Sequence, residues 1–141
     1  MNETVPRFVL DACALIAYLN DEEGAALVET RLHEATAGKA SVFISAVNVC
    51  EVYYDCLRVK GQEEAKQLLE EILKLPVTIL RIIDNATLEA AGRLKVDENV
   101  SLADAFALAV AKNMNARVLS SDHHELDSVA EKGEIAFEWI R

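Results

Sequence analysis

Four acidic residues occupy positions at which α/β proteins place groups that bind ligands. Asp11 and Asp122 each directly follow a short apolar run that we expect to be a buried strand, and Glu51 and Asp104 lie early in two segments with helical spacing. Ligands of parallel sheets bind beyond the carboxyl ends of the strands. A helix that leads back into a parallel strand begins at that same edge, so we expect all four carboxylates to converge there.

The surroundings of two of these acids are apolar. The positions one helical turn from Glu51 are mainly apolar, and Asp104 shares its face with Ala107, Leu108 and Ala111. A carboxylate on such a face loses hydration, and two carboxylates about 4 Å apart repel by roughly 4 kcal/mol at an effective dielectric near 20. The cluster must therefore take up protons or a cation. Oxygen ligands favour Mg²⁺ or Mn²⁺, and such ions suit phosphodiester hydrolysis.

Each acid also has a purely structural explanation. Ser101 and Asp104 have capping-box spacing, and Asp122 could cap a helix or form a turn. Glu51 could pair with a basic group across an interface. Asp11 at the end of a central strand is the hardest to explain structurally, and one shared site accounts for all four better than four separate coincidences.

Strands alternate with helices along the chain, which predicts a single α/β domain over residues 1–141 with helices on both faces of a mostly parallel sheet. The expected strands span 8–10, 42–44, 77–83, 117–121 and 135–140. The expected helices span 12–19, 24–37, 45–60, 62–75, 86–94 and 101–114.

Composition limits the possible classes of protein. The chain has 141 residues, is 52% hydrophobic and carries a net charge of −10, so it can bury a core but lacks the basic excess typical of nucleic-acid binders. A bound metal could supply the missing positive charge, and an acidic surface would suit a basic protein partner. No signal peptide or membrane span is evident, which favours the cytoplasm. The three cysteines form no CxxC pair, so we expect buried thiols in a reducing compartment.

Four blocks of the sequence resemble the PIN-domain family, and within it the single-domain VapC-like toxins of toxin–antitoxin pairs. The blocks, which contain the four acids in order, are residues 9–16, 45–53, 102–109 and 118–122. The likeness extends over essentially the whole chain. Cys13 and Leu126 depart from the usual pattern, which has a small polar residue and an aromatic one, but neither change removes a carboxylate.

This resemblance implies a three-layer α/β/α sandwich with a five-stranded parallel sheet in the order 3-2-1-4-5. It implies an endoribonuclease that depends on Mg²⁺ or Mn²⁺, cleaves RNA, forms a homodimer and binds a cognate antitoxin, for which a basic protein would suit the acidic surface. The implied catalytic metal ligands are Asp11, Glu51, Asp104 and Asp122, with Asn48 and Ser120 as hydrogen-bonding groups behind them.

Rival interpretations fit less well. A haloacid-dehalogenase-type phosphotransferase needs a second Asp at the position of Cys13, and a receiver domain needs a set of acids and a late Lys that the chain does not offer. A PIN fold kept only for binding RNA or protein stays open as the alternative. His123 and His124 follow Asp122 directly, and we expect them to be exposed and neutral in a loop.

Overall fold

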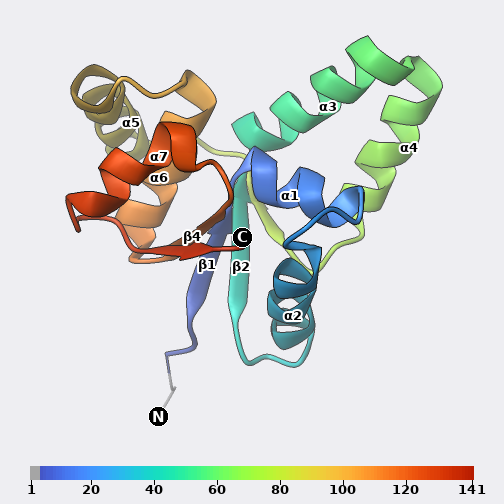
Figure 1. The fold of residues 1–141 in the computed structure, drawn as a ribbon, viewed down its shortest axis with the longest axis horizontal. Coiled ribbons are helices and arrows are strands. Elements are labelled where there is room, and N and C mark those ends of the chain that lie inside the picture. The colour runs from blue at the N-terminus through green and yellow to red at the C-terminus, as the bar shows by residue number, and fades with distance from the viewer. Residues whose placement is uncertain (1–3) are drawn as a thin grey trace.

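A computed structural model describes residues 4–141, which fold around a five-stranded parallel sheet (Figure 1). The strand order is β3-β2-β1-β4-β5, which confirms the predicted architecture. The strands are β1 (Arg7–Leu10), β2 (Ser41–Ser45), β3 (Thr78–Leu80), β4 (Arg117–Ser120) and β5 (Phe137–Trp139).

Helices cover both faces of this sheet, giving the expected three layers. The helices are α1 (Ala12–Leu19), α2 (Ala25–Thr36), α3 (Ala46–Lys60), α4 (Gln62–Leu73), α5 (Asn85–Glu98), α6 (Leu102–Met114) and α7 (His123–Glu131). One core is formed with α1 to α4 and the other with α5 to α7. Figure 1 shows these two groups of helices on opposite sides of the sheet.

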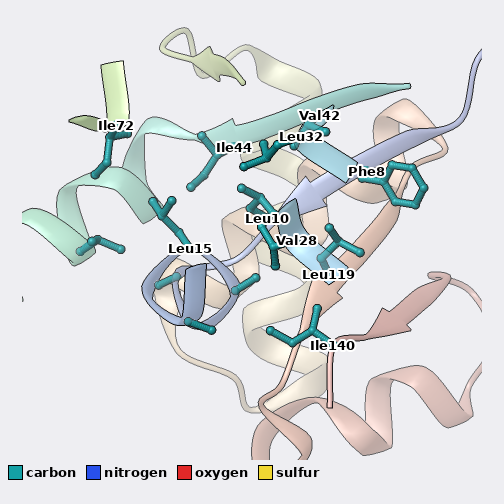
Figure 2. Close-up of a cluster of buried hydrophobic side chains, with 14 of the residues drawn as sticks. Phe8, Leu10, Leu15, Val28, Leu32, Val42, Ile44, Ile72, Leu119 and Ile140 are labelled. Carbon is teal, nitrogen blue, oxygen red and sulfur yellow. The ribbon is translucent and has the colours of Figure 1, made fainter. Parts of the chain in front are cut away.

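The central strands are apolar on both sides because both of their faces are covered. Phe8 and Leu10 of β1 point into the core beneath α1 and α2 (Figure 2). Val9, between them, belongs to the other core. Leu119 and Val118 of β4 divide in the same way. This alternation explains why a short run without polar residues forms each of these strands.

Side chains at the strand ends start the helices that follow. The N-caps of α1, α3, α6 and α7 are Asp11, Ser45, Ser101 and Asp122 respectively, and each accepts a hydrogen bond from a backbone N–H of its helix. Three of these helices follow a strand with almost no loop. Their first turns are therefore fixed at the carboxyl edge of the sheet.

The end of the chain is held against α2. Gly24 has φ of +97°, and a Cβ there would lie 2.8 Å from Cγ1 of Ile140, so only glycine lets the two segments approach. Arg31 donates two hydrogen bonds to Glu138 of β5, at 2.8 and 2.6 Å, and its guanidinium lies over the ring of Phe8. These contacts fix the edge strand beside the core.

Several expectations about elements were wrong. Helix α7 was not predicted: a nine-residue helix with two histidines in its first turn carries little periodic signal, and His123 and His124 lie in it rather than in a loop. The third and fifth strands are shorter than expected, and Ile82, assigned to a strand, is 86% exposed.

The cysteines are not buried: Cys50 is exposed and the other two are partly so. No helix among residues 4–141 is long and apolar enough to cross a membrane.

Candidate active site

The four predicted acids converge at the carboxyl edge of the sheet. Asp11 and Asp122 follow β1 and β4, Glu51 lies on α3, and Asp104 is in the first turn of α6. Their charges act on one another: those of Asp122 and Glu51 raise the pKa of Asp11, and that of Asp11 raises the pKa of Asp104. Residues from four separate segments thus form one acidic cluster.

A fifth acid, Glu125, joins the cluster and was missed in the sequence. One carboxylate oxygen from each of Asp104, Asp122 and Glu125 lies within 4.8 Å of the others. Glu125 stands three residues after Asp122, whose Oδ1 accepts a hydrogen bond from its backbone N–H at 3.2 Å. An Asp followed three residues later by Glu is a helix-start pattern, and this was the signal that could have revealed both α7 and its acid.

Asp11 is a buried carboxylate with one free oxygen. Its side chain is almost fully enclosed; Oδ1 accepts the N–H of Ala14 at 2.8 Å, whereas Oδ2 has no hydrogen-bond partner among the described residues. Burial raises the pKa of Asp11 to about 6, although the nearby Ser120 side chain and the N–H of Ala14 oppose the rise. A buried, unpaired carboxylate oxygen is costly unless a ligand satisfies it.

Asp104 and Glu125 share a proton. Burial, followed by a hydrogen bond with Glu125, raises the pKa of Asp104 to about 8, while the same contact lowers the pKa of Glu125. These opposite shifts favour a protonated Asp104 beside an ionised Glu125. A proton on Asp104 reduces the repulsion between the two carboxylates, as a bound cation would.

The helix-capping roles considered for Asp104 and Asp122 are confirmed only in part. Ser101 accepts the N–H of Asp104 at 3.1 Å, as in a capping box. However, hydrogen bonding from the Ser101 backbone N–H lowers the pKa of Glu125, so Glu125 takes the role that the box would assign to Asp104. Asp122 caps α7 through Oδ1. Asp122 thus caps a helix, whereas Asp104 lies in the first turn of a helix that Ser101 caps, and both carboxylates belong to the cluster.

Asn48 and Ser120 lie fully buried behind the acids. Asn48 donates through Nδ2 to the carbonyl of Ala103 at 3.2 Å, which ties α3 to the start of α6, and its amide opposes the rise that burial causes in the pKa of Glu51. Ser120 accepts the N–H of Asp122 at 3.0 Å through Oγ. Within the described chain, Oδ1 of Asn48 has no partner, so a second buried oxygen of this site is unsatisfied.

Lys and Arg side chains of the described residues do not pair with these acids. Within residues 4–141, none of the five carboxylates of the cluster forms a salt bridge with Lys or Arg. Glu51 also lacks such a partner, and burial and the charge of Glu125 raise its pKa. The pairing with a basic group that could have explained Glu51 structurally is thus absent from this part of the chain.

The cluster can bind cations or protons, but it does not activate a nucleophilic side chain. Cys13 lies beside it, and burial together with the charges of the acids raises the pKa of this thiol to about 12, so it stays protonated. The two ring nitrogens of His123 are occupied by Asp127 and by the Arg141 carbonyl. The remaining donors are oxygens, the set that Mg²⁺ and Mn²⁺ prefer.

Fold and site together define an α/β domain that gathers carboxylates at the carboxyl edge of a parallel sheet. The sequence model of the PIN domain family matches residues 8–132, and the chain belongs to this family. No curated protein sequence matches it.

Solved structures with the same fold include DNA-bound VapBC proteins and a VapC toxin. VapBC2 from Rickettsia felis, bound to a DNA fragment from its promoter, has a TM-score of 0.73 at 14% identity, covering 94% of this chain and 98% of that chain. DNA-bound VapBC from Salmonella typhimurium has a TM-score of 0.75 at 15% identity, covering 97% and 100%. VapC20 from Mycobacterium tuberculosis, a sarcin–ricin loop cleaving toxin, has a TM-score of 0.64 at 18% identity, covering 86% and 94%. At these identities the likeness concerns the fold.

Proposed function

We propose that this protein is an endoribonuclease that depends on Mg²⁺ or Mn²⁺ and acts as the toxin of a toxin–antitoxin pair. The observation that carries the proposal is a cluster of five acids with no Lys or Arg counter-ion among the described residues, in a chain of the PIN domain family. Cleavage of the sarcin–ricin loop by VapC20, which has this fold, supports RNA as the substrate.

The residues present fit a divalent cation. The oxygens of Asp104, Asp122 and Glu125 lie within 4.8 Å of one another, close to the roughly 3 to 4 Å between neighbouring oxygen ligands of one such ion. Asp11 adds a buried oxygen that lacks a partner, and Glu51 adds another carboxylate at the rim. We assign metal binding to Asp11, Glu51, Asp104 and Asp122, and we add Glu125.

A divalent cation bound there supplies activation of water and neutralisation of charge on the scissile phosphate. Hydrogen bonds within the chain position two of the proposed ligands. Ala14 holds Oδ1 of Asp11 and leaves Oδ2 without a hydrogen-bond partner among the described residues, and Ser120 fixes the backbone from which Asp122 projects. Asp104 and Glu125 would hold the cation as two carboxylates, and the raised pKa of Asp104 would make this binding compete with protons.

The proposal includes partners and a location. Structures of this fold include VapBC and FitAB bound to DNA and a toxin–antitoxin complex from Klebsiella pneumoniae, which supports a cognate antitoxin for this chain. The net charge of −10 suits a basic segment of that antitoxin. We assign a homodimer to the free toxin and the cytoplasm, where cellular RNA is found, as its location.

The test is incubation of purified protein with total cellular RNA, with Mn²⁺ or with EDTA, followed by mapping of the cut ends. Wild type should cleave at defined positions with Mn²⁺ and not with EDTA, and Asp104→Asn should be inactive. Asp84→Asn, at the exposed N-cap of α5, should keep full activity. Full activity of Asp104→Asn would refute the mechanism, and RNA binding without cleavage by wild type would favour a binding module.

A further inference from the structure

Three rings form a stack between the last strand and the helix that bears two of the acids. Phe137 and Trp139 lie on the same face of β5, with ring centroids 5.0 Å apart and planes 12° from parallel. The ring of His123, the first residue of α7, lies on Trp139 at 3.9 Å and 26°. His123 directly follows Asp122, so this stack ends beside the acidic cluster.

The ring of His123 is held on three sides. Nδ1 lies 2.7 Å from Oδ1 of Asp127, Nε2 lies 2.9 Å from the carbonyl oxygen of Arg141, and Trp139 covers one face. The side chain is nevertheless 46% exposed. Since one face and both nitrogens are in contact, most of the exposed surface must belong to the second face of the ring.

We propose that the free face of His123 is a stacking site for a nucleobase of the RNA substrate, next to the phosphodiester bond that is cleaved. The proposal rests on the proposed function and adds a residue that positions the substrate. A ring fixed before binding loses little conformational freedom when a base stacks on it. Every base has a π-face, so the site would tolerate different bases.

The charge of the protein favours this mode of binding. A chain with a net charge of −10 gains little from phosphate contacts, which supply most of the affinity of ordinary nucleic-acid binders. Base stacking does not require a basic surface. A ring beside Asp122 would therefore add affinity without introducing a basic side chain that competes with the cation for the carboxylates.

The experiment measures RNA binding without cleavage. Asp104→Asn protein is titrated into a short, labelled single-stranded RNA, and anisotropy gives Kd. Adding His123→Ala should weaken binding about ten-fold, and adding His123→Phe should restore it, because a phenyl ring also stacks on both Trp139 and a base. The control is His124→Ala, its exposed neighbour on α7, which should leave Kd unchanged.

A second measurement keeps the proposal testable if His123→Ala folds poorly. Single abasic nucleotides are placed in turn along the RNA, and one position should weaken binding to the Asp104→Asn protein, whether residue 123 is His or Phe. Trp139 is the only tryptophan of the chain, so its fluorescence should change on binding of intact RNA and less at that abasic position.

Equal Kd values for protein with His123 and with His123→Ala would overturn the proposal, as would abasic RNAs that all bind like the parent. In the cleaving protein, His123→Ala should raise KM and leave kcat within about two-fold. If wild type binds RNA through His123 but never cleaves it, the proposed function fails while the stacking site stands. If wild type cleaves RNA and His123→Ala does so with the same KM, the stacking site fails alone.

Discussion

Replacing Asp104 by Asn should stabilise the protein in the absence of metal and remove its response to metal. In the folded chain Asp104 is largely buried and shares a proton with Glu125, which raises its pKa to about 8. Asn has nearly the same shape and carries no charge. Its side-chain amide can donate to Glu125 as the protonated carboxyl does, so the variant should keep the hydrogen bond.

The size of the effect follows from the pKa of Asp104. In the unfolded chain the group has its ordinary value of 3.8 and is ionised at pH 7. Keeping it protonated in the folded protein at pH 7 costs at most about 4 kcal/mol, at roughly 1.4 kcal/mol per pH unit. The lowered pKa of Glu125 returns part of this. We therefore expect Asp104→Asn to gain about 2 kcal/mol, or roughly 5 °C in Tm.

The assay is thermal unfolding at pH 7 in EDTA and in millimolar Mn²⁺. Wild type should gain stability with Mn²⁺ through linkage, and Asp104→Asn should start higher and respond little. Asp84 is the matched control: it also caps a helix, accepting the N–H of Thr87 at 2.9 Å, but it is exposed and its pKa is lowered. Asp84→Asn should not gain stability. A lower Tm for Asp104→Asn than for wild type in EDTA would refute the reasoning.

Three further predictions concern the acids and the end of the chain. Because the pKa values of Asp11 and Asp104 are raised to about 6 and about 8, the metal-free protein binds protons more tightly when folded, so its free energy of unfolding should fall as pH rises from about 4 to 8 in urea titrations; a rise would contradict these assignments. Glu125→Gln should weaken Mn²⁺ binding about ten-fold by calorimetry, and unchanged affinity would remove Glu125 from the site. Gly24→Ala should lose about 2 kcal/mol of stability in urea, because φ is +97° and the new Cβ would lie 2.8 Å from Ile140; a wild-type midpoint would show that the segment relaxes freely.

The sequence was most informative where a buried strand meets an acid. The runs that end at Leu10 and at Ser120 are apolar on both faces, so the strands were recognisable, and Asp11 and Asp122 after them had to lie at one edge. Spacing from the helix starts then placed Glu51 early on its helix. These inferences needed only the spacing of apolar and polar residues along each segment, which local sequence encodes.

Other features depend on contacts that local sequence does not encode. The strand order was available only from the resemblance to the PIN-domain family, because nothing within a strand specifies its neighbour. Helix α7 is short and exposes its two histidines, so its few apolar residues, Leu126 and Val129, gave no clear period. Glu125 was missed with it. The proton shared with Asp104 depends on packing between α6 and α7 and could not be predicted.

The most direct test of the central claim is anomalous diffraction from crystals grown with millimolar Mn²⁺. A peak should lie within about 2.2 Å of carboxylate oxygens of Asp104 and Asp122, and it should be absent from crystals of Asp104→Asn. A cluster without a peak in wild-type crystals, or a peak that persists unchanged in Asp104→Asn, would contradict a cation site built from these acids.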